Sequence, residues 1–397
     1  MLDGLRILAV EQYGAGPFGT LFLADLGAEI VKIENRAEGG DVSRMVGPYF
    51  HATLPESSRS FFFQGLNRGK KSVTLDLGKP RGREVFHRLV EGAHAVVSNL
   101  RGDVPEKLGI TYRHLGAINP KIVCAHLTGY GREGERAAWP GYDYLMQAET
   151  GYFHLTGEPD TPPTRFGLSL VDLMSGVALA AGLLAALRAA DQRGRGRDVD
   201  VSLFDLALFN LNYIGHWYLN VGAATGRVAR SAHAALTPCQ SYRTRDGWIY
   251  VMCNKEKFWG ALCRKIGRRE WIEDARFRSF PDRLKHRALL TELLDGALQS
   301  HTTDEWLKKF AGSVPAAPIY DVTQALENPW VRDSRRIESV PVQDGKPLRL
   351  LTNPLRGEGL PIAGRLAPAL GADTDAILGE AGFSSGEIER LREAGVI

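Results

Sequence analysis

RILAVEQYGAGPFGTLFLADLGAEIVKIE, residues 6–34, is the stretch that decides the fold. Two short apolar runs, at 6–10 and 28–34, flank a glycine-containing turn and a segment with helical periodicity. Short apolar runs bounded by turn signals predict strands, and a helix between two strands is typical of a parallel βαβ unit. The stretch therefore predicts the first unit of an α/β domain.

The same alternation continues through the first 200 residues. Short apolar runs separated by helical stretches predict four more strands, at 71–77, 93–99, 121–130 and 199–205. Apolar strands alternating with helices are typical of a parallel sheet that is covered on both faces. We therefore predict an α/β fold with a Rossmann-like large domain.

The pattern changes after about residue 225, and a length of 397 residues is enough for two domains. Residues 241–253 predict a hairpin that turns at Asp246-Gly247, and amphipathic helices follow it. The C-terminal stretch 384–396 has a serine start signal and a helical period. We expect a large domain at 1–225, completed by about 326–397, and a smaller α+β domain at 226–325.

The overall composition is ordinary for a soluble globular protein and argues against several function classes. A net charge of +3 without long Lys/Arg runs speaks against a nucleic-acid partner. The four cysteines show no CxxC spacing, which predicts reduced thiols of a cytoplasmic protein and no metal site. The N-terminus lacks a signal-peptide pattern. The longest apolar run, Leu173 to Leu187, is short for a membrane span and predicts a buried helix.

A dinucleotide-binding fingerprint is one interpretation of the N-terminal turn. Gly14, Gly16 and Gly19 fit G-x-G-x-x-G after a strand, and Glu34 ends the second strand, where a ribose-binding acid is expected. On spacing alone, this indicates an NAD-dependent oxidoreductase. The alternative is a tight turn that only connects strand and helix, with Pro17 as a first helical residue.

A wider set of motifs resembles one enzyme family. The set runs in the family's order: LDGLRILAVEQYGAGPFGTLFLADLGAEIVKIE (2–34), GGDVSR (39–44), LNRGKKSVTLDL (66–77), SNLRGDVPEKLGI (98–110), INPKIVCAHLTGYG (118–131), GYDYLMQAETG (141–151), GLSLVDLMSG (167–176) and GRGRDVDVSLFD (194–205). Together these stretches resemble the class III coenzyme A transferases, which include formyl-CoA transferase, carnitine CoA-transferase and the 2-methylacyl-CoA racemases. The ordered set outweighs the dinucleotide fingerprint.

The resemblance implies that Asp172 is the catalytic nucleophile. Transfer of CoA between carboxylic acids through this residue needs a carboxylate that attacks a thioester and carries the acyl group as an anhydride. Judged from its neighbours alone, Asp172 is better explained as a helix N-cap, because aspartate accepts hydrogen bonds from free N–H groups, and the resemblance reverses this preference.

Two further catalytic positions follow from the resemblance. Asp143 matches an acidic position that flanks the nucleophile, with a capping carboxylate as the alternative. Backbone N–H groups of the Tyr13–Gly16 turn are candidates for an oxyanion hole, because glycine permits close approach. Formyl-CoA transferase has a glutamine where this chain has Gly14, which predicts more room and a different acyl group.

The resemblance also implies which positions bind CoA, which enters as a thioester substrate, and we expect no permanently bound cofactor. Arg and Lys side chains among these positions offer donors for phosphates. The expected contacts are Tyr13, Asn35, Arg36, Leu66, Lys70, Lys71, Asn99, Leu100, Arg101, Lys107 and Tyr142.

The reaction and the assembly are predicted only by class. We expect a CoA transferase for C4–C5 dicarboxylates such as succinate, malate or mesaconate, or one that transfers within a single molecule. The resemblance implies a homodimer of interlocked chains, and the short apolar run predicts no membrane partner. A CoA-binding protein without catalysis is a third interpretation, after the transferase and the oxidoreductase.

A racemase of the same superfamily is the main alternative within the resemblance. Such racemases place a histidine beside an aspartate in the stretch that matches Gly141–Asp143, because abstraction of an α-proton needs a base with a suitable pKa. Here the position is Tyr142, and an ordinary tyrosine has a pKa of about 10. A displaced base at His126 or His154 stays open at this point.

Overall fold

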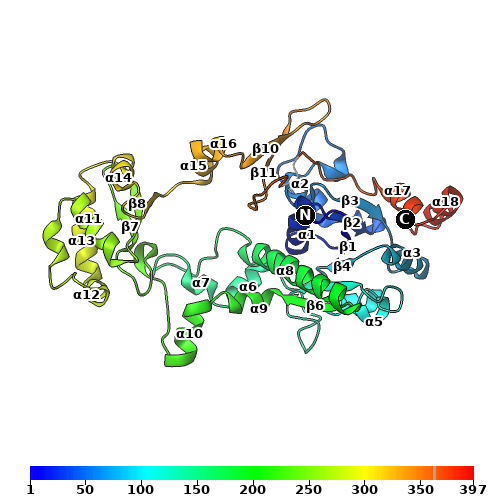
Figure 1. The fold of residues 1–397 in the computed structure, drawn as a ribbon, viewed down its shortest axis with the longest axis horizontal. Coiled ribbons are helices and arrows are strands. Elements are labelled where there is room, and N and C mark those ends of the chain that lie inside the picture. Colours follow the sequence, from blue (N-terminus) through cyan, green and yellow to red (C-terminus); the bar gives the residue numbers. More distant parts are fainter. Residues whose placement is uncertain (361–363) are drawn as a thin grey trace. The chain divides into compact units, whose positions relative to one another are not determined.

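The computed structural model describes residues 1–360 and 364–397, and these form two compact units (Figure 1). Unit 1 comprises residues 1–150, 167–212 and 330–397, and unit 2 comprises 151–166 and 213–329. The sequence places 151–166 and 213–225 in the larger domain, whereas both segments group with unit 2. The functional meaning of the domain ranges stays a prediction.

Unit 1 is built on a six-stranded sheet with the order β3-β2-β1-β4-β5-β6. Each neighbouring pair of strands is parallel, which confirms the predicted α/β class. The strands are β1 (Arg6–Val10), β2 (Glu29–Glu34), β3 (Lys71–Thr74), β4 (Ala95–Ser98), β5 (Val123–Thr128) and β6 (Arg197–Ser202).

Strand β6 ends earlier than the sequence predicts. The predicted range runs to Asp205, but the strand stops at Ser202 and a helix begins at Leu203. The Ser202 Oγ accepts the N–H of Asp205 at 3.0 Å, which is the N-cap geometry that favours a helix start over continued strand.

Helices connect the strands and cover the sheet. The helices of unit 1 are α1 (Ala15–Asp25), α2 (Phe61–Asn67), α3 (Pro80–Glu91), α4 (Val104–Leu108), α5 (Tyr112–Leu115), α6 (Asp143–Glu149), α8 (Leu170–Arg193), α9 (Leu203–Phe209), α17 (Thr374–Glu380) and α18 (Ser385–Glu393). A separate antiparallel pair, β10 (Ile337–Val340) with β11 (Leu348–Leu351), completes this unit, and α16 (Pro329–Asp333) precedes it.

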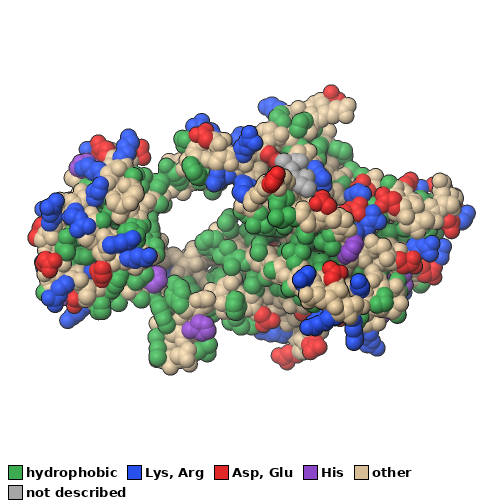
Figure 2. All heavy atoms as spheres, viewed as in Figure 1, with side chains coloured by type: hydrophobic (Ala, Val, Ile, Leu, Met, Phe, Trp, Pro, Cys, Tyr) green, Lys and Arg blue, Asp and Glu red, His purple; other side chains and the backbone are tan. Residues whose placement is uncertain are grey.

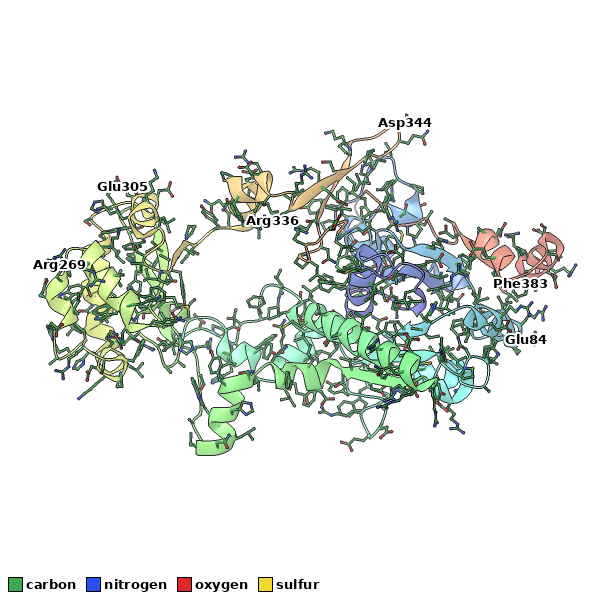
Figure 3. All side chains as sticks on the ribbon, in the orientation of Figure 1. Glu84, Arg269, Glu305, Arg336, Asp344 and Phe383 are labelled. Atoms are coloured by element: carbon green, nitrogen blue, oxygen red, sulfur yellow. The ribbon has the colours of Figure 1, made fainter. Side chains whose placement is uncertain are left out.

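The C-terminal helices close one face of the sheet. Ile377 of α17 and Leu391 of α18 are buried in the same core as Val31 and Val73 of the strands. Phe383, between the two helices, packs against this core and is labelled in Figure 3. The predicted serine start of the last helix is confirmed by a capping box of Ser384 and Glu387.

Helix α8 is longer than the apolar run that predicts it. At 24 residues it is long and apolar enough to cross a membrane, by length and composition alone. One face packs on α1, β5 and β6, as expected of a core helix, whereas Met174 and Val177 on another face are exposed. The prediction of a buried helix therefore holds for one face only.

Unit 2 contains a three-stranded antiparallel sheet with a helical layer. The predicted hairpin is confirmed by β7 (Cys239–Arg243) and β8 (Trp248–Met252), and β9 (Ala316–Pro318) pairs with β8. Apolar residues from strands and helices, including Trp259 and Trp306, form a separate core. The helices are α7 (Tyr152–Leu155), α10 (Asn212–Val221), α11 (Glu256–Lys265), α12 (Phe280–Lys285), α13 (Arg287–Leu298), α14 (Thr303–Phe310) and α15 (Val322–Glu327).

Candidate active site

A cleft of about 560 Å³ opens at the carboxyl edge of the parallel sheet in unit 1. Segments that follow β1, β4, β5 and β6 line it, and the order of the strands reverses between β1 and β4. This reversal is the point at which open parallel sheets bind their ligands. The lining residues are Gln12, Tyr13, Gly14, Ala15, Val42, Asn99, Leu100, Arg101, Val104, Leu127, Thr128, Gly129, Pro140, Gly141, Tyr142, Asp172 and Leu203.

Asp172 lies in this cleft, in the first turn of α8. The N-cap position belongs to Ser169, so the interpretation of Asp172 as an N-cap is wrong. A Cβ built on Gly14 would lie 2.9 Å from the Asp172 Oδ2, so the carboxylate sits directly over the turn. The expected extra room beside Gly14 is therefore occupied by the Asp172 carboxylate.

The contact between α1 and α8 sets the position of Asp172. A Cβ on Gly19 would lie 2.5 Å from the backbone oxygen of Gly176, and a Cβ on Gly176 would lie 2.5 Å from that of Ala15. Only glycine at both positions allows the two backbones to approach this closely. The close crossing brings the N-terminus of α1 against the first turn of α8.

The electrostatics of the cleft favour protonation of Asp172. Its side chain is largely buried, with the residue only 8% exposed. Burial, with a smaller contribution from the negative charge of Asp143, raises the pKa of Asp172 to about 7. At neutral pH a large fraction of Asp172 is therefore ionised while the carboxylate keeps little hydration, a state suited to nucleophilic attack.

Asp143 holds the backbone N–H of Asp172. Its Oδ2 accepts the N–H of Asp172 at 2.9 Å, and its Oδ1 accepts the Gln147 side chain at 2.6 Å. The N–H of Asp172 belongs to the first turn of α8 and has no carbonyl partner within the helix. Asp143 therefore satisfies this helix end from the neighbouring helix α6.

The Tyr13–Gly16 turn supplies fewer free donors than the sequence predicts. The N–H of Tyr13 donates to Asp41 Oδ1 at 2.9 Å and is not available to a substrate. The N–H groups of Gly14, Ala15 and Gly16 have no acceptor in the described part of the chain. Gly14 and Ala15 line the cleft, so the candidate oxyanion donors are at the N-terminus of α1.

Seven of the expected site residues meet in the cleft: Tyr13, Gly14, Asn99, Leu100, Arg101, Tyr142 and Asp172. Asn99 has a bracing role, because its side chain both accepts from and donates to the backbone of Gln12, at 2.8 and 2.7 Å. Arg101 is exposed and paired with Asp103 at 2.6 Å. Arg101 is the sole cationic side chain among the described residues that line the cleft.

Four of the remaining expected CoA contacts lie outside the cleft that contains Asp172. Asn35 lines an adjacent cavity of about 300 Å³ over β1–β3. Arg36 is exposed, Lys107 pairs with Asp103 at 2.5 Å, and Leu66 is half-buried in α2. None of these four lines the cleft that contains Asp172.

The two adjacent lysines also lie outside the cleft, and both are paired within the fold. Lys70 is fully buried, with its ammonium 2.8 Å from Glu11 Oε1, so its prediction as a phosphate ligand conflicts with the structure. Burial lowers the pKa of Lys70 to about 8, against the opposing effect of Glu11. Lys71 begins β3 and pairs with Glu29, which begins β2, at 2.5 Å. Lys71 therefore lies at the amino edge of the sheet, opposite the cleft.

The dinucleotide interpretation fails on Glu34. Both carboxylate oxygens are already bonded inside the fold, to Arg44 at 2.6 and 2.8 Å and to Ser72 at 2.6 Å. A saturated buried carboxylate cannot bind the hydroxyl groups of a ribose. Pro17 is the third residue of α1 rather than the first, so its predicted helix position is also wrong.

Comparison with known proteins identifies the family. The model of CoA-transferase family III matches residues 2–374. The chain belongs to this family. It is therefore a class III acyl-CoA:carboxylate CoA-transferase, which confirms the predicted enzyme class and rules against the oxidoreductase.

Individual relatives of this CoA transferase are similar along most of their length. The acetyl-CoA:oxalate CoA-transferase of Acetobacter aceti is 35% identical over 82% of each chain. The succinyl-CoA:mesaconate CoA-transferase of Haloarcula hispanica is 32% identical over 97% of each chain. The crystal structure of a CAIB/BAIF family protein from Brucella suis is 31% identical, covers 96% of this chain and 99% of its own, and superposes with a TM-score of 0.81.

The role of Asp41 beside the candidate site was not predicted. Asp41, which binds Tyr13, lies in the quoted GGDVSR stretch, so the motif was noticed but its role was not.

His126 is not a base in the cleft: its unexposed ring lies between Ser98 Oγ at 2.8 Å and Asp198 Oδ1 at 3.2 Å. His154 belongs to unit 2.

Proposed function

We propose that this enzyme moves CoA between carboxylic acids through a covalent intermediate on Asp172. The observation that carries the proposal is the Asp172 carboxylate, buried in the cleft against the N-terminus of α1, with a pKa raised to about 7 by burial and by Asp143. A poorly hydrated carboxylate that lies beside unpaired backbone N–H groups is suited to attack on a thioester.

The first half of the reaction loads CoA onto the enzyme. An oxygen of the ionised Asp172 attacks the thioester carbonyl, and the C–S bond breaks to release CoA thiolate and leave a mixed anhydride. The thiolate then attacks the aspartyl carbonyl of this anhydride. The C–O bond breaks, the donor acid leaves as a carboxylate, and Asp172 carries CoA as a thioester.

The second half repeats these steps with the acceptor acid. The acceptor carboxylate attacks the aspartyl thioester, which releases the thiolate and forms a second mixed anhydride. Attack of the thiolate on the acceptor carbonyl gives the new acyl-CoA and regenerates the Asp172 carboxylate. No proton is gained or lost overall, so the reaction needs no general base on the α-carbon.

Each step develops negative charge on a carbonyl oxygen. The N–H groups of Gly14 and Ala15, which line the cleft, are the donors that we assign to this charge, because they lack other acceptors in the described part of the chain. Asp143 keeps Asp172 in place by binding its N–H. The apolar lining from Leu127, Pro140 and Leu203 limits hydrolysis of the anhydrides.

We assign dicarboxylates of four or five carbons to the enzyme as substrates. Two relatives carry names with oxalate or with succinyl-CoA and mesaconate, which supports small diacids as donor and acceptor. In the cleft, Arg101 offers a cation for a second carboxylate or for a CoA phosphate. Tyr142 is well exposed in the cleft and suited to bind a substrate oxygen through its hydroxyl.

A transfer assay in deuterated water tests this function against the racemase. With succinyl-CoA and either mesaconate or malate, mass spectrometry is expected to show CoA on the added acid and no deuterium at the α-carbon. No histidine lines the described cleft, so the second base that the racemases pair with an aspartate is missing there. Deuterium incorporation as fast as CoA transfer would show the α-proton abstraction on which a racemase depends, and a failure to transfer to any acid would contradict the proposal.

We also propose that the enzyme is an interlocked homodimer in the cytoplasm, with no membrane partner. Helix α10 has no buried residue, and Leu219 and Val221 are 78% and 77% exposed; Figure 2 shows hydrophobic side chains at its surface. In unit 1, α8 exposes Met174 and Val177. Exposed apolar side chains on two helices support burial by a second copy. The four cysteines are free and buried, which suits a reducing compartment.

Subunit exchange tests the interlocked dimer. Tagged and untagged protein, mixed under native conditions, are expected to form no hybrid over a day, because interlocked chains separate only by unfolding. Refolding the mixture from denaturant provides the control and should yield hybrids. A monomer at micromolar concentration, or hybrids formed within minutes, would show that the chains are not interlocked.

A further inference from the structure

A buried pair of opposite charges lies behind the Tyr13–Gly14 turn. The Lys32 Nζ is 2.8 Å from Asp41 Oδ2 and donates to the backbone oxygen of Glu11 at 2.8 Å. Neither the Lys32 nor the Asp41 side chain is exposed. A fully buried ion pair is a costly way to fill a core, because apolar residues of the same volume are often at least as stabilising. The pair therefore calls for a role beyond stability.

The second oxygen of Asp41 is bonded to the turn itself. Its Oδ1 accepts the N–H of Tyr13 at 2.9 Å and that of Ser43 at 2.8 Å. Tyr13 has a φ of +66°, in the left-handed region that residues with a side chain rarely adopt unless their surroundings hold them there. Asp41 therefore binds the backbone of the residue that has this strained conformation.

The segment that carries Asp41 is anchored on its other side. Glu34 Oε1 accepts the N–H of Asp41 at 3.0 Å, and the same carboxylate binds Arg44 at 2.6 Å. Arg44 and Glu34 are almost completely buried. The Asp41 side chain is thus held in place by Lys32 and by the anchored backbone of Asp41. Through its hydrogen bond with the Tyr13 N–H, it also fixes the position of the turn.

The charges of this cluster keep Asp41 ionised. Burial would raise the pKa of Asp41, but the charge of Lys32 and hydrogen bonds from Lys32, Tyr13 and Ser43 outweigh it and lower the pKa. Burial would likewise lower the pKa of Lys32, yet the charges of Asp41, Glu11 and Glu34 raise it. Both partners therefore stay charged across the range of pH at which the enzyme is assayed.

We propose that Asp41, held by Lys32, is a positioning residue that latches the Tyr13–Gly14 turn against the carboxylate of Asp172. The proposal rests on the proposed function, because the turn leads into the backbone N–H groups that we assign to the oxyanion. A Cβ on Gly14 would lie 2.9 Å from Asp172 Oδ2, so rotation of the turn alters the surroundings of the nucleophile directly. The latch acts on the chemical step and not on CoA binding.

Two double variants that differ only in a hydrogen-bond acceptor test the latch. Lys32→Met/Asp41→Leu removes both charges and the acceptor for Tyr13, and Lys32→Met/Asp41→Asn removes the charges but keeps the acceptor. Neither leaves an unpaired charge at these two positions. We expect kcat to fall about 100-fold in the leucine variant, with KM for acyl-CoA nearly unchanged, because small displacements of catalytic groups have effects of this size. The asparagine variant should recover most of this loss.

Asp25→Asn is the matched control. Asp25 forms a buried ion pair with Arg68 at 2.6 Å at the other end of α1, away from the turn. This variant should lower the melting temperature without changing kcat. Equal kcat losses in the control and in both double variants would show that the Lys32–Asp41 pair only stabilises the fold, and this result would overturn the latch. Wild-type kcat in the leucine variant would also overturn it.

Hydrogen exchange tests the latch without any turnover. The amide of Tyr13 should exchange faster in Lys32→Met/Asp41→Leu than in Lys32→Met/Asp41→Asn, because only the asparagine still accepts its hydrogen bond. Unchanged exchange in both variants contradicts the latch, whatever the activity. A wild-type enzyme that transfers no CoA but shows the exchange difference would contradict the proposed function and leave the latch intact.

Discussion

Asp172→Asn is expected to abolish CoA transfer while the protein remains folded. The amide cannot form the anhydride or the aspartyl thioester, so turnover should fall by at least about 1,000-fold, the scale of losing a covalent nucleophile. Circular dichroism and size-exclusion chromatography should match the wild type. Asp191→Asn, an exposed change near the far end of α8, is the control and should leave kcat unchanged.

Trapping identifies the intermediate directly. Acyl-CoA followed by hydroxylamine should convert Asp172 to a hydroxamate, which is detected by mass spectrometry on the peptide that contains it. The asparagine variant should give no such peptide. Retention of even a tenth of the wild-type rate in Asp172→Asn, or a hydroxamate on another residue, would show that Asp172 is not the nucleophile.

Asp172→Asn, which is expected to abolish activity, is expected to increase the stability of the fold at neutral pH. An unfolded aspartate has a pKa of about 3.9, whereas burial and Asp143 raise that of folded Asp172 to about 7. The folded state therefore binds this proton more tightly, and the stability it contributes is lost as the pH rises through about 7. Asp172→Asn should match the wild type near pH 4 and be more stable above about pH 7, by on the order of a few kcal/mol. Thermal melting at both pH values measures this difference.

The pH dependence of acylation follows from the same pKa. Only the ionised carboxylate attacks, so the single-turnover rate should rise about tenfold per pH unit below the pKa and level off above about 7. This profile is linked to the stability loss, because the charge that reacts is the charge that destabilises the fold. If Asp172 is the nucleophile, the ionised form that reacts also lowers the stability of the folded protein.

The sheet was predictable because its signal is local. Alternating apolar runs and helical periods are present in the sequence from β1 to β6, and each predicted strand overlaps an observed one. The end of β6 was not predicted correctly. The helix start at Leu203 depends on the hydrogen bond from the Asp205 N–H to the Ser202 hydroxyl, and this bond is not evident from the apolar pattern of the strand. Burial of one face of α8 was predictable from its composition, but its exposed face was not.

The chemistry of the site was predictable only in part. Asp172 was selected through a motif, but its raised pKa and its contacts with α1 and α6 are not encoded in any local pattern. Lys70 and Lys71 are adjacent in sequence and chemically alike, yet one is a core charge bound to Glu11 and the other lies at the amino edge of the sheet. Only the three-dimensional arrangement separates them, because Lys70 precedes β3 and contacts Glu11, whereas Lys71 begins β3 and contacts Glu29.

Gly14→Ala is the second substitution for which we expect a large loss of activity. The added Cβ would lie 2.9 Å from Asp172 Oδ2, closer than real Cβ contacts allow. The backbone of Asp172 has little freedom to move, because Asp143 holds its N–H and the Gly19–Gly176 contact fixes the spacing of α1 and α8. The side chain must therefore rotate away from the donors of the turn, and kcat should fall about 100-fold.

Binding and chemistry can be separated in this variant. Gly14→Ala should bind CoA with an affinity near that of the wild type in calorimetry, because the methyl group displaces the nucleophile rather than the nucleotide, and the hydroxamate yield on Asp172 should fall with kcat. Gly379→Ala in α17 is the matched control, since a Cβ there meets no atom within 4 Å and its φ is not positive. The control should retain full activity and equal or greater stability, as alanine favours a helix. Wild-type kcat in Gly14→Ala would mean that the turn and the carboxylate are not in contact when the enzyme reacts, and the assignment of the oxyanion donors to the start of α1 would be wrong.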